Sequence, residues 1–376
     1  MSLRSIVRGA REAWEVPRDL LLGRYPGFVT GGGLARGEVP VFVFHEAEAE
    51  AFARKLEHLA RNDYATLSID EYMAMLRGSM KAPERAVLLT FDDGRGSVWN
   101  VAAPLLRRHG MRAVVFLVPG RVPTHAPRPA SQHAPLMSWE EIDSLSRDGL
   151  FDFQSHTLLH ARVHTGSALA GFVTPRSRRG YHAFDQPLVR DGERDLVGAE
   201  VPLGTPLLES SPRTSEDLRF FEAEMPRTAC VAAVADAGGE AFFERPGWEK
   251  RLRALFQGRG APLRVETKQQ QAAAIRRELV EARRIIEERV GRPAVHLCYP
   301  WHVAGPTARA LAAEVGYETA FCGKVDGVPV TLQGGDPRAI ARLGEDYLEL
   351  LPGAGRSTLA AVLRRKWSRR FGSAPE

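Results

Sequence analysis

Apolar runs of strand length alternate with amphipathic segments along most of the chain. The strand-like runs occupy residues 39–44, 64–68, 86–91, 112–118, 150–154, 295–299 and 318–322. Between them, apolar residues recur at steps of three and four, which is the spacing of one helix face. Strands that alternate with helices predict a parallel sheet with crossover helices. The sequence therefore predicts an α/β fold.

Local signals mark where several of the predicted helices begin and end. The clearest helix covers residues 267–290, where Ile275, Leu279, Ala282, Ile286 and Val290 share one face and Gly291 follows. Ser138 and Glu141 have the spacing of a capping box. Gly110 is expected to end the helix of residues 97–108 in the left-handed conformation.

Residues from about 166 to 264 interrupt this alternation. They are rich in Pro, Gly, Arg and Ser, but the pairs Phe220-Phe221 and Phe242-Phe243 argue against plain disorder. We expect this insertion to fold as a cap or subdomain over the end of the barrel at which the predicted strands terminate. The predicted organisation is an N-terminal extension (1–38), a first barrel part (39–165), the insertion (166–266), a second barrel part (267–350) and a basic C-terminal tail (351–376).

Composition narrows the functional classes. The 376 residues are 44% apolar and 26% charged, which is typical of a soluble globular protein. A net charge of +5 over this length is too small for a nucleic-acid-binding surface. The three scattered cysteines form neither a disulfide framework nor a CxxC site. Charged residues interrupt the first 23 positions, so no signal peptide is predicted, and we expect a cytoplasmic protein.

The C-terminal tail has two interpretations. Leu359, Val362, Leu363 and Trp367 fall near one helical face, and a dense basic cluster surrounds them. The favoured interpretation is a helix that packs on the barrel and exposes its basic face. The alternative is a peripheral contact with the anionic inner face of a membrane.

Candidate catalytic groups follow two of the predicted strands. Asp92 and Asp93 come directly after residues 86–91, and His156 and His160 follow residues 150–154. If residues 156–160 form a helical turn, the two imidazoles share one face and can bind one divalent ion. Each feature alone also has a purely structural interpretation. The aspartates could belong to a turn in which one of them caps the following helix, and the two histidines could be structural residues. Together they provide the carboxylate and imidazole ligands of a catalytic metal site at the mouth of a β/α barrel.

These motifs resemble those of the polysaccharide deacetylases, the NodB-type homology domain of carbohydrate esterase family four. Thr90 to Gly94 is similar to the first family motif and Ser155 to His160 to the second, while Cys298 to Trp301 resembles the proline–aromatic third motif. The resemblance covers residues 39–164 and 267–343. It implies a distorted (β/α)7 barrel, here with a large insertion.

The resemblance also implies roles for individual residues. Asp93, His156 and His160 would bind one divalent ion, for which Zn²⁺ is the first expectation and Co²⁺, Ni²⁺ or Mn²⁺ are alternatives. Asp92 would be the general base that takes a proton from the attacking water. The backbone amide near Trp301 would help to hold the oxyanion.

The sequence departs from the family pattern at two places. Cys298 stands where many relatives have an arginine that steadies the base, and residues 348–352 lack the late histidine that serves as general acid. His302 is the leading candidate for the acid and His45 the second, although either could be a structural histidine. We also expect His45 and Tyr299 to contact the substrate.

The expected activity is removal of N-acetyl groups from an acetylated saccharide, which could be a polysaccharide, an oligosaccharide or a lipid-linked glycan. Metal-activated water would attack the acyl carbon. Two alternatives stay open, because site chemistry does not follow from fold alone. One is a relative that hydrolyses another C–N or ester bond, and the other is a glycan-binding homologue without activity. No nucleic-acid partner is expected.

Overall fold

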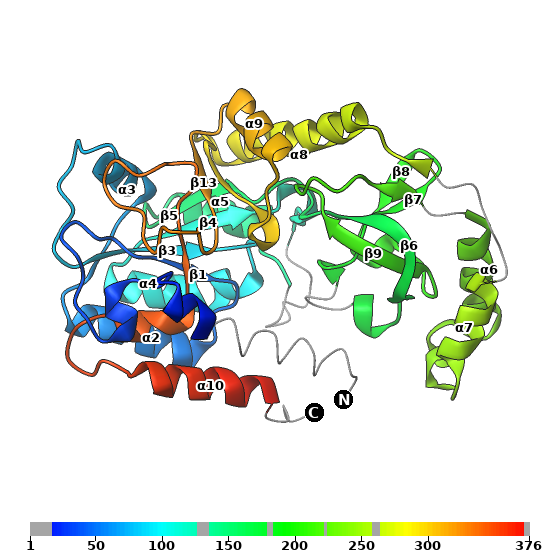
Figure 1. Cartoon of the computed structure of the whole chain (residues 1–376), viewed down its shortest axis with the longest axis horizontal. Coiled ribbons are helices and arrows are strands. Elements are labelled where there is room, and N and C mark those ends of the chain that lie inside the picture. Colours follow the sequence, from blue (N-terminus) through cyan, green and yellow to red (C-terminus); the bar gives the residue numbers. More distant parts are fainter. Residues whose placement is uncertain (1–16, 126–134, 179–182, 222–223, 258–263, 372–376) are drawn as a thin grey trace.

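A parallel sheet organises the fold. The computed structural model describes residues 17–125, 135–178, 183–221, 224–257 and 264–371; residues 1–16 of the predicted N-terminal extension lie outside these ranges. The strands follow the order β13–β12–β5–β4–β3–β1–β14, and β2 pairs beside β3 (Figure 1). Their bounds are β1 (Val41–Phe44), β2 (Ala65–Thr66), β3 (Ala86–Phe91), β4 (Ala113–Leu117), β5 (Phe151–Ser155), β12 (His296–Cys298), β13 (Thr319–Phe321) and β14 (Leu343–Gly344).

The two edges of this sheet approach each other through one short segment of chain. Ile340 forms a parallel bridge with Phe321 of β13. Two residues later the same segment becomes β14, where Leu343 pairs with Phe42 of β1. Residues 340–344 therefore link both edges, and the seven strands of the path curve into a distorted barrel.

Helices connect and cover the strands (Figure 1). They are α2 (Ala49–Arg61), α3 (Ile69–Leu76), α4 (Ala103–His109), α5 (Trp139–Ser146), α8 (Lys268–Val290) and α9 (Pro306–Val315), and a π-helical turn at Val98–Ala102 precedes α4. Shorter 3-10 turns cover Gly27–Thr30, Pro119–Arg121, Arg176–Arg178, Gly198–Glu200, Gly239–Glu244, Pro300–His302 and Glu345–Leu350. The predicted alternation of strands and helices in a parallel sheet is confirmed.

Alternate side chains of the strands enter different apolar clusters. In β3, Val87, Leu89 and Phe91 pack in the large cluster that includes residues of α2, α4 and α5. Leu88 belongs instead to a second cluster, which also contains Val114 and residues of α3. Every residue of β3 is buried, as expected for a strand covered on both faces.

The helix boundaries read from the sequence are confirmed. Ser138 and Glu141 form a reciprocal capping box at the start of α5. Gly110 and Gly291 end α4 and α8 with φ values of 63° and 72°. These left-handed conformations suit glycine because it has no Cβ to clash with the backbone.

The segment between the two barrel parts folds beside the barrel, with hydrophobic clusters of its own (Figure 1). Its longest pairing is antiparallel, between β6 (Arg162–Phe172) and β9 (Pro206–Pro212). It also contains β7 (Val189–Asp191), β8 (Arg194–Leu196), β10 (Phe220–Phe221), β11 (Arg264–Val265), α6 (Glu224–Asp236) and α7 (Trp248–Gln257). β6 begins before the predicted boundary at residue 166, so the insertion grows directly out of the loop that carries His160.

The C-terminal helix α10 (Leu359–Phe371) packs on the barrel through part of its apolar face. Val362 is buried in the main cluster and Leu359 packs against it. Lys366 lies 3.5 Å from Asp346, whereas Trp367 is 58% exposed. The favoured interpretation of the tail thus accounts for Val362 and Leu359, and the membrane contact stays a prediction.

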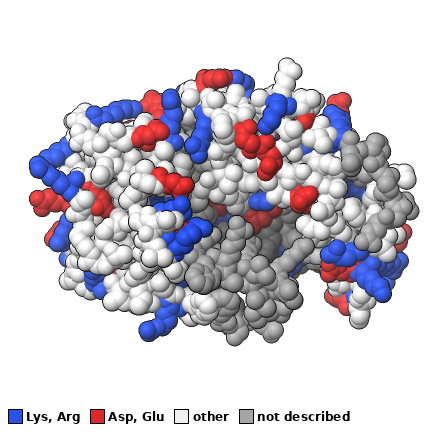
Figure 2. Space-filling model, in the orientation of Figure 1, with Lys and Arg blue, Asp and Glu red and all other residues white. Residues whose placement is uncertain are grey.

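The surface gives no sign of a single-sign patch on the face in view. Figure 2 shows Lys and Arg interspersed with Asp and Glu there, consistent with the small net charge. Within the ranges that the structure describes, no helix combines the length and the apolar character needed to cross a membrane.

The first testable feature is the start of α8. Thr267 accepts a hydrogen bond from the backbone N–H of Gln270 at 3.2 Å. Replacing Thr267 by Ala should lower the free energy of unfolding by about 1 kcal/mol, because one N–H of the first helical turn loses its partner. Urea denaturation would measure this difference. Thr267→Ser keeps the oxygen and is the matched control; an equal loss in both variants would show that the cap is not the cause.

Candidate active site

A small cavity opens at the carboxyl ends of the barrel strands. Its volume is about 170 Å³. It is lined by His45, Asp92, Asp93, Arg95, His156, His160, Phe184, Asp185, Trp301 and His302. Seven of the eight residues predicted for the site line this cavity, and among them Trp301 and His302 come from the turn after β12. Only Tyr299 is absent. Catalytic groups of β/α barrels occupy this end of the strands.

Three potential metal ligands converge on one point. Asp93 Oδ1 lies 3.6 Å from His156 Nε2 and 3.5 Å from His160 Nε2. All three residues are buried, and among the described residues Asp93 Oδ1 has no hydrogen-bond partner. A buried carboxylate oxygen without a partner is costly. A divalent ion between these three atoms would satisfy it, so the donor set fits a metal.

The two histidines have the protonation state that ligands need. His156 Nδ1 lies 2.8 Å from the carbonyl oxygen of Cys298, so this nitrogen carries the proton and Nε2 is left free to bind. Burial lowers the pKa of His160 to about 3, although the charge of Asp93 opposes the shift. Burial also lowers the pKa of His156. Both rings are therefore neutral at pH 7.

The prediction that His156 and His160 share a helical turn is wrong. Residues 156–161 form an irregular loop between β5 and β6. Thr157 and His160 adopt left-handed φ values of 63° and 51°, and Asp93 has a φ of 69°. These conformations are costly outside glycine and persist where surrounding structure enforces them. The loop brings the two imidazoles together by strained turns instead of by helical periodicity.

Asp93 remains ionised despite its burial. Burial alone would raise the pKa of Asp93, but its interactions with His160, His156 and Arg95 lower the pKa. Because both imidazoles are neutral at pH 7, Arg95 provides the permanent positive charge. Arg95 donates two hydrogen bonds to Asp93 Oδ2, at 3.0 and 2.8 Å. One carboxylate oxygen is thus neutralised by Arg95, while the other faces the histidines.

A second group of possible ligands, Asp92, His156 and Cys298, is less suitable for a metal. Its ligand atoms also lie within 4.8 Å of one another. However, both oxygens of Asp92 already accept hydrogen bonds from Arg342. Burial raises the pKa of the Cys298 thiol well above its usual value, whereas metals bind the thiolate. The group that contains Asp93 therefore fits a metal better.

Arg342 is the functional residue that the sequence analysis missed. Its Nη1 lies 2.7 Å from Asp92 Oδ1 and its Nη2 lies 2.8 Å from Asp92 Oδ2. Burial alone would raise the pKa of Asp92, but the charge of Arg342 outweighs it and holds the pKa well below its usual range. The Cys298 sulfur lies 2.8 Å from Arg342 Nη2. The arginine expected at position 298 is therefore supplied from the segment that joins the edges of the sheet.

One sequence signal could have revealed this arginine. Arg342 is a charged residue inside the apolar run from Ile340 to Leu343. A charge placed there must be paired or exposed, and the structure leaves none of its side chain exposed. Its partner is separated from it by 250 residues, so only the fold could identify Asp92.

The insertion completes the wall of the cavity. The Trp301 ring lies tilted against the His160 ring, with their centres 4.1 Å apart, and Trp301 Nε1 donates a hydrogen bond to Asp185 Oδ1 at 3.3 Å. Phe184 contacts the His160 ring edge-on at 5.7 Å. The Arg162 guanidinium lies 5.1 Å from the centre of the Trp301 ring. No sequence motif indicated Phe184 or Asp185, because the insertion has no regular pattern to place them.

The two candidate acids both line the cavity, but in different settings. His302 Nδ1 lies 3.4 Å from Arg342 Nη2. Loss of hydration around the ring, followed by the charge of Arg342, lowers the pKa of His302, although part of the residue is exposed to solvent. His45 Nε2 lies 4.0 Å from Asp92 Oδ2, and its side chain is 49% exposed. Tyr299 does not reach the cavity; it is 2% exposed and packs with Leu297. Its side chain is therefore not placed for the predicted substrate contact.

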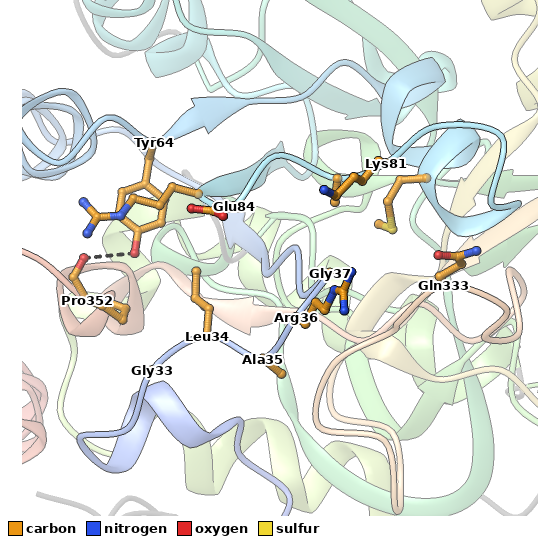
Figure 3. Close-up of a pocket in the computed structure, with 13 residues that line it drawn as sticks. Gly33, Leu34, Ala35, Arg36, Gly37, Tyr64, Lys81, Glu84, Gln333 and Pro352 are labelled. Carbon is orange, nitrogen blue, oxygen red and sulfur yellow. Dashed lines mark hydrogen bonds between the residues drawn. The ribbon is translucent and has the colours of Figure 1, made fainter.

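A larger hollow lies at the other end of the barrel (Figure 3). Its volume is about 910 Å³, and its walls include residues that precede β1 and β3, among them Arg36, Lys81 and Glu84. Tyr64 donates there to the carbonyl oxygen of Pro352 at 3.0 Å. The amino ends of barrel strands serve stability instead of catalysis. Size therefore does not identify the active site here; the chemistry of the smaller cavity does.

Replacing Arg342 by Met should reduce the free energy of unfolding by about 3–5 kcal/mol, because Asp92 would remain buried without its counter-ion. In the variant, burial without Arg342 would raise the pKa of Asp92. Asp92 would then become protonated as the pH falls, and the loss of its unpaired charge would reduce the destabilisation. Wild type keeps its paired carboxylate until well below pH 3.8. The stability difference should thus be largest at neutral pH and shrink toward acid.

Chemical denaturation of both proteins across this pH range tests the pairing. Arg338→Met removes an exposed arginine from the same region and should change stability little. A pH-independent loss in the Arg342 variant would contradict the role assigned to the Asp92–Arg342 pair.

Comparison with known proteins identifies the relatives of this domain. Residues 79–175 match the family model described as polysaccharide deacetylase. The Bacillus subtilis protein YxkH, named as a polysaccharide deacetylase, is 25% identical over 135 residues, which cover 34% of this chain and 45% of that protein. The poly-beta-1,6-N-acetyl-D-glucosamine N-deacetylase of Staphylococcus epidermidis is 28% identical over 113 residues, which cover 30% and 37% of the two chains. The matches span less than half of these relatives.

The fold has a counterpart among solved structures. A de-N-acetylase from Aggregatibacter actinomycetemcomitans superposes with a TM-score of 0.52 at 16% identity, over 81% of this chain and 94% of the other. At this identity the likeness shows the fold alone, and it confirms the predicted distorted barrel. The matched family model includes Asp92, Asp93, His156 and His160. The similarity to the polysaccharide deacetylase family thus covers the part of the chain that carries all four of these residues.

Proposed function

We propose that this protein is a metal-dependent hydrolase that removes N-acetyl groups from an acetylated saccharide. The proposal rests on one observation: the Nε2 atoms of His156 and His160 both face Asp93 Oδ1, which has no hydrogen-bond partner among the described residues. The carboxylate of Asp92, which is bound by Arg342, lies beside them. Two imidazole nitrogens and one carboxylate oxygen form a donor set typical of catalytic Zn²⁺, although Co²⁺, Ni²⁺ or Mn²⁺ can bind similar ligands.

The residues around Asp93, His156 and His160 are proposed to have separate roles in hydrolysis. An ion held there would polarise the acyl carbonyl and lower the pKa of a water molecule. Asp92 is ionised and can accept the proton of the attacking water, because a carboxylate that binds Arg342 retains further lone pairs. The backbone N–H of Trp301 is proposed to stabilise the negative oxygen of the tetrahedral intermediate.

Breakdown of the intermediate requires a proton for the leaving amine. Water has then added to the acyl carbon, the C–N bond breaks, the amine takes the proton and acetate departs. Apart from the proposed ligands His156 and His160, the cavity is lined by the imidazoles of His302 and His45. The lowered pKa of His302 makes it mostly neutral at pH 7, so it would have to receive a proton during the reaction. The side chain of His45 is 49% exposed to solvent.

The cavity favours the acyl end of a substrate over a sugar chain. Its volume of about 170 Å³ is below the roughly 300–1,000 Å³ of pockets that enclose a whole small ligand. The saccharide itself would extend outside, against the exposed carboxylate of Asp185 and the indole of Trp301. The named activity of the Staphylococcus epidermidis relative makes β-1,6-linked N-acetylglucosamine the first substrate to test. Esters and other C–N bonds are the alternative substrates.

Metal content is the first test. Purified protein should bind about one divalent ion per chain, and the His156→Ala/His160→Ala double variant should lose tight binding, because only one of three protein ligands remains. Elemental analysis after dialysis measures the occupancy. His125→Ala, at an exposed histidine, is the matched control. Full occupancy of the double variant would show that these histidines do not bind the ion.

The second test separates the base from the ligands. Asp92→Asn should retain the metal but reduce kcat by at least ~10², because the side chain keeps its shape and loses its basic carboxylate. Deacetylation of N-acetylglucosamine oligomers by the metal-loaded protein provides the rate. Asp143→Asn changes an exposed aspartate and should be silent. Turnover close to wild type in Asp92→Asn would place the base elsewhere.

A further inference from the structure

Residues 156–161, which carry His156 and His160, are called the ligand loop below. One peptide group of this loop forms hydrogen bonds through both its C=O and its N–H. The carbonyl oxygen of Leu158 accepts a hydrogen bond from the backbone N–H of Gly120 at 2.9 Å. The N–H of the same peptide unit, which belongs to Leu159, donates to Glu278 Oε2 at 3.0 Å. Rotation of this peptide would break both bonds. It lies between His156 and His160, so its orientation determines how the loop places the second ligand.

Glu278 differs from the other carboxylates of α8. Glu281, Glu287 and Glu288 form ion pairs with arginines of the same helix. Glu278 is 5% exposed, and no ion pair joins it to a cation within the described ranges. Burial raises the pKa of this carboxyl. Burial of a carboxyl group lowers stability unless the group forms hydrogen bonds, and Glu278 forms one with the N–H of Leu159.

His160 needs such support more than His156 does. The His156 ring is oriented by its hydrogen bond to Cys298. His160 Nδ1 is buried and has no hydrogen-bond partner among the described residues. The position of its ring therefore depends on its ring contacts and on the backbone of the loop. That backbone is strained at both Thr157 and His160, so it would relax if it were released.

We propose that Glu278 is a positioning residue for the metal site, which fixes the Leu158–Leu159 peptide and thereby holds His160 Nε2 in line with Asp93 and His156. This inference rests on the metal site proposed above. Glu278 touches neither the ion nor the substrate; it acts through the loop. Outer residues that orient metal ligands commonly change affinity by about 10–100-fold.

Gly120 provides an independent route to the same peptide. A Cβ at this position would lie 2.8 Å from the oxygen of Leu158, and the leucine side chains next to it leave little room to yield. Gly120→Ala should therefore displace the Leu158–Leu159 peptide from its carbonyl side, whereas Glu278 holds the same peptide from its N–H side. Its expected effect on metal affinity has the same sign.

Three variants of α8 separate the hydrogen bond from the bulk of the side chain. Glu278→Met keeps the length but has no strong acceptor, Glu278→Gln keeps an acceptor oxygen, and Glu288→Met changes an exposed glutamate of the same helix. The dissociation constants of Zn²⁺ and Co²⁺ would be measured by chelator competition, and the visible absorption of the Co²⁺ form would report ligand geometry. We expect affinity to fall about 10–100-fold in Glu278→Met, with an altered Co²⁺ spectrum. Glu278→Gln should restore both, and Glu288→Met should match wild type.

The outcomes distinguish this inference from the proposed function. If wild type binds no divalent ion, the proposed metal site is wrong. If wild type binds the ion and a folded Glu278→Met binds it equally well with an unchanged spectrum, only the role of Glu278 is overturned. Equal losses in Glu278→Met and Glu278→Gln would also overturn it. Should Glu278→Met fail to fold by circular dichroism, Gly120→Ala decides: unchanged affinity in that variant would refute control through this peptide.

Discussion

Two adjacent carboxylates buried at the end of β3 impose the main constraint on this structure. Asp92 and Asp93 are 1% and 2% exposed, and uncompensated charges would not be tolerated there. Each receives a different compensation. Arg342 binds both oxygens of Asp92. In Asp93, Arg95 binds one carboxylate oxygen, and the other oxygen faces the two imidazoles. The difference separates a carboxylate suited to accept a proton from one suited to hold a metal.

The barrel makes this division possible because it joins distant parts of the chain. Asp92 and Arg342 are 250 residues apart, and Cys298 contributes its sulfur from β12 between them. The segment that links β13 to β1 carries Arg342 inward at the point where the barrel closes. Closure of the sheet and ionisation of Asp92 therefore depend on the same few residues.

The ligand loop and the insertion form a second unit around His160. α8 supports the loop through Glu278, and the turn that follows β12 places Trp301 on the imidazole ring. Phe184 and Asp185 then close the cavity from the insertion. Six non-glycine residues in the described ranges have positive φ, and all except Asp63 lie at or beside this site, namely Asp93, Thr157, His160, Trp301 and His302. Backbone strain concentrated at one site is common where geometry is functional.

The sequence by itself determined the elements and the chemistry that sits at their ends. The strand 86–91 and the helix 267–290 follow from local periodicity and caps, which act within a few residues. The aspartate pair and the histidine pair were visible as motifs for the same reason. The helical turn expected around His156 was wrong, because the loop is held by contacts with Gly120 and Glu278 that spacing does not encode.

Only the tertiary structure decided which groups meet. It paired Arg342 with Asp92, placed Tyr299 outside the cavity and brought Phe184 and Asp185 into the cavity beside His160. None of these pairings has a local signature, because electrostatic compensation acts through space and is indifferent to separation along the chain. Local preferences thus specify strands, helices and motifs, whereas the partners of buried charges are specified by closure of the barrel.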